Sequence, residues 1–251
     1  MGFVVAAVVL AGLFGALVLT PATSVPSPSF SEARAEANAS IADLSGGGWE
    51  LLLGVGVDQP HAQQVSVSAA VNATGNSCTL TALPGYPLPS SVTVPSYSGG
   101  LGAGRAPVWL FIFNQSSTGT YLLVGVEGAV AAPVGYLSGS ACVASLGQVH
   151  PVPAKFVDSV NAAQVAWTNS VSNASAFVAA DPAIGSLVML GAGSSVRSSI
   201  SLPAGWLFDY TPCGPFPTGA ATHNVTNFLV GVGAAGAFLS ALTSTTPCPT
   251  S

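Results

Sequence analysis

Charged side chains are scarce in this sequence. Four of its 251 residues are basic and nine are acidic, so that 5% are charged, where an ordinary soluble domain has about 25%. The net charge of −5 excludes proteins that hold nucleic acid through its phosphates, because these need a basic face. The apolar fraction of 49% excludes a disordered, solvated chain. We therefore expect a folded protein without a nucleic-acid partner.

Signatures of catalysis, metal binding and cofactor binding are also missing. The chain has no Gly-x-Ser-x-Gly, no His-x-x-x-His and no Cys-x-x-Cys. Gly231–Gly236 matches Gly-x-Gly-x-x-Gly, but no acidic residue follows to bind a ribose, so we interpret it as a turn between strands. His61, His150 and His223 are scattered, and we interpret His61 as an exposed loop residue. We predict a protein that is not an enzyme and has neither cofactor nor metal.

The amino end carries a long uncharged run, Phe3 to Leu19. As a helix its seventeen residues span about 26 Å, the short end of a bilayer crossing, and Pro21 stops it. The run is long for a signal peptide and no basic residue precedes it, although Ala22-Thr23-Ser24 is a candidate cleavage site. Three interpretations of residues 3–19 remain open: a membrane anchor, a cleaved signal peptide and a buried core helix. The first two export the rest of the chain.

Two further features favour export. The chain holds four cysteines, an even number that is compatible with two disulfides in an oxidising compartment. It also holds five Asn-x-Ser/Thr sequons, each an acceptor where glycosylation machinery is present. The five asparagines are Asn38, Asn72, Asn114, Asn173 and Asn224.

An internal repeat is the strongest pattern in the sequence. Four blocks recur in the same order, and in both copies a cysteine, Cys142 or Cys248, follows nineteen residues after the start of the fourth block. The blocks are Leu53–Gly56 with Leu190–Gly193, Ser90–Ser96 with Ser198–Ala204, Trp109–Phe113 with Trp206–Tyr210, and Leu123–Val126 with Leu229–Val232. We predict two tandem α+β repeats. The predicted organisation is anchor or signal 1–20, Pro/Ser linker 21–29, repeat 30–148, linker 149–153 and repeat 154–251.

Each predicted repeat opens with a helix and continues with strands. Ser31 is a candidate N-cap for a helix that ends at Gly46, and Asp158 for one that runs to about Ala180. Period-two alternation follows, for example over Ser91–Val94 and Ser199–Leu202. We therefore expect each repeat to pack a helix on a curled antiparallel sheet. This element order resembles cystatin-like and PepSY-like domains.

The cysteines fit this scheme. Cys142 and Cys248 are predicted at the end of the last strand of each repeat, whereas Cys78 and Cys213 lie in insertions that only one repeat has. The favoured pairing is Cys78–Cys142 and Cys213–Cys248, because each bridge then pins an insertion to its own repeat. The two other connectivities stay open.

Several polar and aromatic positions have a structural interpretation. Glu32 and Glu36 share a helix face, which is typical of a solvated helix start, and Trp109 and Trp206 are expected in the core. Asp209 stands where the first repeat has Ile112, so it marks either an outward position or a polar difference. Sparse carboxylates leave little stability that depends on ionisation. This favours an exported protein of an acidophile, or close packing in a surface layer.

We expect an exported, membrane-anchored, non-catalytic cell-surface protein whose duplicated module serves binding or surface assembly. Its location is extracellular, on the cell surface or membrane-anchored. One alternative is a filament subunit, since an apolar N-terminal helix before an uncharged, sequon-bearing body resembles archaeal type IV pilins; Pro21, Pro26 and Pro28 depart from their continuous stalk helix. A secreted enzyme is the second alternative.

Overall fold

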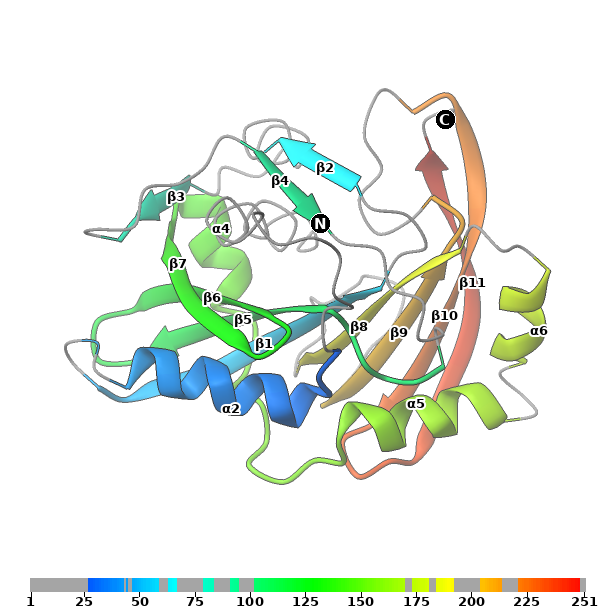
Figure 1. Cartoon of the computed structure of the whole chain (residues 1–251), viewed down its shortest axis with the longest axis horizontal. Helices are drawn as coiled ribbons and strands as arrows, with labels where there is room; N and C mark the ends of the chain where they lie inside the picture. Colours follow the sequence, from blue (N-terminus) through cyan, green and yellow to red (C-terminus); the bar gives the residue numbers. More distant parts are fainter. Residues whose placement is uncertain are drawn as a thin grey trace.

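Figure 1 shows the computed structural model of the chain. The structure describes residues 27–42, 44, 47–58, 63–66, 79–83, 91–94, 102–169, 173–180, 184–191, 204–213 and 221–248. The N-terminal run of residues 3–19, Cys78, Asn72, His61 and the strand predicted at 199–202 lie outside these residues.

The described chain is α+β, as the sequence predicts, and is dominated by one antiparallel sheet of nine strands in the order β11-β10-β9-β8-β1-β5-β6-β7-β3. A separate pair, β2 with β4, lies on the side of the sheet away from α2 and α5 (Figure 1). The strands are β1 (Trp49–Asp58), β2 (Gln63–Ser66), β3 (Thr79–Ala82), β4 (Ser91–Val94), β5 (Val108–Gln115), β6 (Thr120–Glu127), β7 (Val130–Ser138), β8 (Gly185–Gly191), β9 (Gly205–Thr211), β10 (His223–Gly233) and β11 (Phe238–Cys248).

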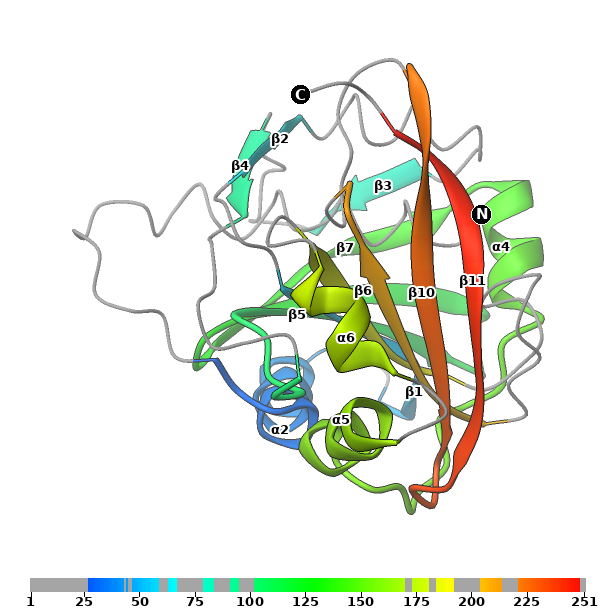
Figure 2. The ribbon, with the colours of Figure 1, turned by 90° about the vertical axis from the view of Figure 1, so that its right-hand side faces the viewer.

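The described helices are α2 (Phe30–Ile41), α4 (Ser140–Leu146), α5 (Ser159–Thr168) and α6 (Ala174–Ala179). α2 packs against β5, β6 and β7, while α5 packs against β9 and β10. Figure 2 shows α2 and α5 side by side on the same face of the sheet. The predicted helix-on-sheet layering is therefore present.

Strands from both predicted repeats lie in this one sheet, joined by the antiparallel pair β1–β8. On one side of that pair the order is β1-β5-β6-β7, and on the other it is β8-β9-β10-β11. The blocks that recur in the sequence are paired alike: Trp109 lies opposite Val126, and Trp206 lies opposite Val232. Each neighbouring leucine lies opposite a glycine, in the pairs Leu110–Gly125 and Leu207–Gly231.

The two tryptophans also make the same hydrogen bond. Trp109 Nε1 donates to the carbonyl oxygen of Pro28 at 2.9 Å, and Trp206 Nε1 donates to that of Val157 at 3.0 Å. Pro28 and Val157 each stand immediately before the N-cap residue of a helix, α2 or α5. Both indole rings are fully buried, which confirms their predicted core position.

The first recurrent block does not keep this register. Gly56 of β1 lies opposite Trp109, whereas Leu190 of β8 lies opposite Trp206. The sequence match instead equates Leu53 with Leu190, three residues away. The size of the Trp109 ring explains why position 56 is a glycine, because a Cβ on Gly56 would come within 2.8 Å of that ring. The Leu-Gly match is therefore out of step with the strand pairing.

Both predicted helix boundaries need correction. The N-cap of α2 is Ser29, not Ser31: the Ser29 hydroxyl accepts from Glu32 N–H and the Glu32 carboxylate accepts from Ser29 N–H, which is a capping box. Asp158 caps α5 as predicted, but that helix ends at Thr168, because Asn169 is extended (φ −66°, ψ 121°). α6 is a separate helix.

Aromatic side chains join the two halves into one core. Phe30, at the start of α2, is fully buried and packs edge-on against both Trp109 and Trp206, with ring centroids 5.5 and 5.0 Å away. It also contacts Phe111 and Phe156. Small buried residues, Ala33 and Ala37 on α2 and Ala162 and Ala166 on α5, let both helices approach this sheet face. The same hydrophobic cluster holds residues of both predicted repeats.

Candidate functional site

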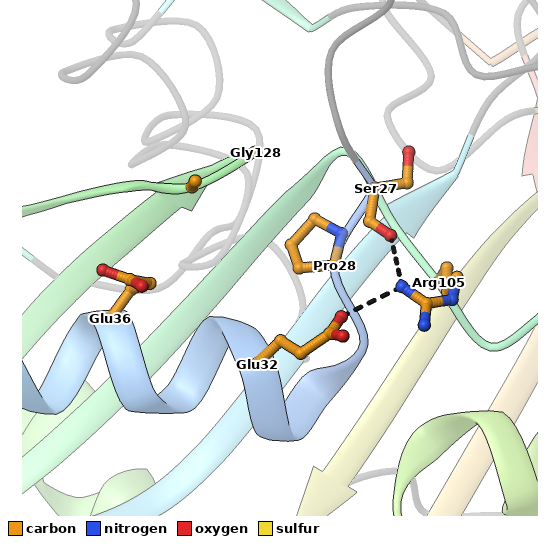
Figure 3. A pocket seen from close by; sticks show the side chains of 7 residues that line it. Ser27, Pro28, Glu32, Glu36, Arg105 and Gly128 are labelled. Atoms are coloured by element: carbon orange, nitrogen blue, oxygen red, sulfur yellow. Dashed lines mark hydrogen bonds and ion pairs between the residues drawn. The ribbon is translucent and has the colours of Figure 1, made fainter.

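A shallow hollow of about 360 Å³ lies beside the N-terminal end of α2. The start of this helix forms one wall, and the β6–β7 turn with the segment before β5 forms the rest (Figure 3). It is lined by Ser27, Pro28, Glu32, Glu36, Arg105, Gly128 and Ala129.

An ion pair lines the hollow. Arg105 Nη1 donates to Glu32 Oε2 at 2.9 Å and to the carbonyl oxygen of Ser27 at 3.0 Å (Figure 3). The Ser29 N–H and then Arg105 hold the pKa of Glu32 below its usual value, although partial burial opposes them. Glu36, one helical turn further along, is exposed and has no hydrogen bond with a described residue. The predicted solvated start of this helix is confirmed.

The charges in the hollow determine which groups it could bind. Two carboxylates and one guanidinium leave the hollow with one excess negative charge, which suits an amine or a cationic side chain. The lining contains no histidine, lysine or cysteine.

A second polar site joins the two helices at their N-terminal ends. The Phe30 N–H donates to Ser159 Oγ at 2.8 Å, and the Ser31 N–H donates to Asp158 Oδ1 at 2.9 Å. Burial by itself would raise the pKa of Asp158, but hydrogen bonds from Ser29, Ser31 and Ser159 lower it below its usual value. One carboxylate thus serves the positive ends of both helix dipoles. This contact is structural, because it satisfies the helix N–H groups themselves.

The Asp209 side chain is buried and does not face the solvent. It is 1% exposed in β9, and Asn227 of β10, equally buried, donates from Nδ2 to Asp209 Oδ1 at 3.4 Å. Its position opposite Leu229 places it on the sheet face away from the tryptophans. The polar difference from Ile112 is therefore the correct interpretation. The sequence pattern of β9 could not decide between an outward position and a polar difference for Asp209. Every residue of this strand is buried, so its two faces do not alternate between apolar and exposed residues.

The predicted site residues are spread over the fold. Asn38 on α2, Asn173 before α6 and Asn224 on β10 are exposed, whereas Asn114 on β5 is half-buried. His150 and His223 are exposed, and His223 Nδ1 lies 3.3 Å from Thr222 Oγ1. The described histidines make no hydrogen bond to a carboxylate. The described part of the chain also has no group of three potential metal ligands.

The second half of the glycine-rich motif Gly231–Gly236 forms a turn between strands, as predicted, whereas its first half, Gly231–Gly233, ends β10. Residues 234–237 connect β10 with β11, and Gly236 has a φ of +88°, a left-handed conformation that favours glycine. The Gly233 N–H donates to the Ala237 carbonyl at 2.7 Å, which closes the hairpin.

The predicted bridge between Cys213 and Cys248 is present, with Cα atoms 5.9 Å apart. It ties the end of β11 to the turn that follows β9. Cys142 lies in α4 rather than at a strand end, since β7 stops at Ser138. Its predicted bridge to Cys78 involves a residue outside the described ranges.

The sequence analysis did not predict three features of the structure. The spacing Ser29-x-x-Glu32 is a capping-box signature that could have identified the start of α2. Arg105 carried no local signal, because its partner Glu32 lies 73 residues away. Burial also raises the pKa of Glu127, at the end of β6, to about 7; this depends on the packing around β6 and not on a motif.

No helix within the described ranges is both long and apolar enough to cross a membrane. Comparisons with protein-family models, with curated protein sequences and with solved structures found no match to this chain.

Proposed function

We propose that this chain is an exported, non-catalytic cell-surface protein, built from two copies of one α+β module, that serves in binding or surface assembly. Residues 3–19 attach it to the membrane unless they are cleaved. In this proposal the two modules share one sheet and one core, and the outer surfaces carry the contacts with other molecules.

The Cys213–Cys248 disulfide carries the proposal of export. Disulfides persist in oxidising compartments and are rare where thiols are kept reduced. The bridge closes a loop of 35 residues between the end of β11 and the turn after β9, so it stabilises an element of the main sheet. The exposed sequons at Asn38, Asn173 and Asn224 agree with an outside location.

The matched strand register supports the duplication. A chance sequence match would have no reason to place Trp109–Val126 and Trp206–Val232 in the same kind of pair. It would also not explain why both indoles donate to the residue before a helix N-cap. A second pair of backbone bonds agrees: Gly128 N–H donates to Pro107 O, and Ala234 N–H to Ala204 O.

The intact mass of the native protein, alkylated with and without reduction, tests the proposal. We expect alkylation of Cys213 and Cys248 only after reduction, and excess mass at the exposed sequons where the host glycosylates. A full-length mass supports the anchor, whereas loss of about the first 24 residues indicates a released protein. Free thiols together with an unmodified mass would refute export.

The two alternatives make different predictions. A type IV pilin-like filament subunit requires a ladder of cross-linked species in intact cells, and loss of residues 3–19 by cleavage would remove its stalk. For a secreted enzyme, the histidines are the general-base candidates that the sequence offers. Substitution of His150 and His223 by alanine would then abolish an activity, whereas a binding protein would keep its ligand or partner.

A further inference from the structure

A row of polar residues crosses the helix-facing side of the main sheet, inside the hydrophobic core. Ser186 on β8 lies directly opposite Tyr210 on β9 and, on its other side, directly opposite Asp58 on β1. Directly opposite residues of antiparallel strands share one face, with Cβ atoms about 4.5–5.5 Å apart. The Tyr210 ring packs edge-on against Trp167 of α5, with ring centroids 6.1 Å apart, so this is the face that the helices cover. Asp58 is 3% exposed, and Ser186 and Tyr210 are fully buried.

The two hydroxyl groups in this row lack a protein partner. Ser186 Oγ and Tyr210 Oη are completely enclosed, and neither forms a hydrogen bond with a described residue. Most buried polar side-chain atoms are bonded, either to protein or to an ordered water molecule. A hydroxyl that is buried with no partner at all destabilises the fold, because it has given up its hydrogen bonds to solvent. Burial also raises the pKa of Tyr210, so its hydroxyl stays protonated and can both donate and accept.

The corresponding place in the other half of the sheet is apolar. Tyr210 ends the recurrent block Trp206–Tyr210, whereas the first copy of this block ends with Phe113. The partner of Phe113 on β1 is Leu51, but the partner of Tyr210 on β8 is Ser186. Phe113 and Leu51 are both buried. Because the same kind of strand pair packs there with apolar side chains alone, the sheet does not need the two hydroxyls in order to form.

We propose that this row holds at least one buried water molecule, bonded to Ser186 Oγ and Tyr210 Oη, with the Asp58 carboxylate as a third polar neighbour. Buried waters typically make about three hydrogen bonds to polar protein groups, and the row supplies three polar side chains on adjacent strands. The enclosure selects water, because a larger molecule would have to displace core side chains. Serine is also smaller than the Leu51 of the corresponding pair, which favours an added water on this side. Such a site goes beyond the proposed function and does not depend on export.

Conservative removal of each hydroxyl gives a test that depends on the sign of the effect. Tyr210→Phe and Ser186→Ala should each lower the melting temperature of the full, disulfide-bonded chain by about 2–4 °C, because each removes a hydrogen bond to the water and leaves the water buried. Without the water, each substitution would remove an unsatisfied group and leave the melting temperature unchanged or raised. Phenylalanine should fold at position 210, since Phe113 fills the corresponding place.

Tyr136→Phe is the matched control for loss of a tyrosine hydroxyl. Tyr136 is half-buried on β7 and makes no hydrogen bond with a described residue. Its substitution should change the melting temperature by less than about 2 °C.

Nuclear magnetic relaxation dispersion of the solvent water tests the site directly, because it counts water molecules that stay inside a protein for longer than the protein takes to tumble. The chain with both Tyr210→Phe and Ser186→Ala should hold at least one fewer such water than the wild type, and Tyr136→Phe should hold the same number. Equal counts in the double variant and the wild type would overturn the water site. A melting temperature that Tyr210→Phe and Ser186→Ala leave unchanged or raise, or a bound small molecule found by native mass spectrometry, would also overturn it. Thiol and sequon modification is independent of these outcomes, so export is tested separately.

Discussion

Replacement of Trp206 or Trp109 by phenylalanine tests the central arrangement of the fold. Both indoles are fully buried, and each donates one hydrogen bond to the carbonyl before a helix N-cap. Phenylalanine keeps a ring in the core but removes the donor and part of the bicyclic volume. The loss combines an unmade hydrogen bond, about 1–3 kcal/mol, with a cavity term of similar size. We expect each variant to lose about 2–6 kcal/mol of unfolding free energy.

The structure also predicts which variant loses more. The Pro28 carbonyl still accepts from the Ala106 N–H at 3.2 Å after Trp109 is replaced. Within the described residues the Val157 carbonyl oxygen accepts no hydrogen bond other than the one from Trp206 Nε1. Trp206→Phe should therefore be the more destabilising of the two.

Urea denaturation of the oxidised protein, followed by far-ultraviolet circular dichroism, measures these differences. Trp167→Phe is the control, because Trp167 lies half-buried on α5 and its indole N–H makes no hydrogen bond to a described residue; we expect a loss below about 1.5 kcal/mol there. Losses under 1 kcal/mol for both core tryptophans, or a larger loss for Trp109→Phe, would refute the reasoning.

Three further predictions concern the disulfide, charge and helix caps. Cys213→Ser with Cys248→Ser opens a loop of 35 residues and should cost about 4 kcal/mol in the chain-entropy model, seen as a lower urea midpoint; an unchanged midpoint would contradict it. Burial raises the pKa of Glu127 from its ordinary value of 4.5 to about 7, so its contribution to stability is complete below pH 4.5 and is lost as the pH rises through 7. Glu127→Gln should then match the wild-type melting temperature at pH 4 and exceed it at pH 8, and an equal difference at both pH values would disprove this. Ser29→Ala removes the capping box of α2 and should cost about 1 kcal/mol, whereas Ser31→Ala should cost less than 0.5 kcal/mol; thermal unfolding that ranks them in reverse would restore Ser31 as the cap.

Acid stability follows from opposing contributions. The pKa values of Glu32 and Asp158 are lowered by hydrogen bonds, so the stability they provide is present above their unfolded values and is lost as the pH falls through their folded values. Glu127 acts in the opposite direction. The chain has only nine acidic residues, so few carboxylates can lose a stabilising interaction when the pH falls. This agrees with the expected tolerance of acid.

Local signals predicted the parts of the fold that depend on nearby residues. Asp158 is followed by a helical pattern and caps α5, the glycine-rich turn before β11 lies where its composition predicts, and Ser91–Val94 is a strand. Trp109 and Trp206 are buried because a large apolar ring inside a β-branched strand block has no better environment than the core. The helix boundary at Thr168 was missed because composition favours helix through the break, and only the extended backbone of Asn169 ends it.

The sequence by itself determined the class of the chain and the two recurrent tryptophan strands, because hydrophobic periodicity is a property of the chain alone. It favoured the Cys213–Cys248 pair but left two other connectivities open, and the structure decided between them. Tertiary structure decided the rest. The pairing of β1 with β8, the contact of Phe30 with both tryptophans, the Glu32–Arg105 ion pair and the burial of Asp209 join residues far apart in the chain. Such contacts depend on how whole layers pack, and no local pattern encodes which strand will lie at the centre of a sheet and which at its edge.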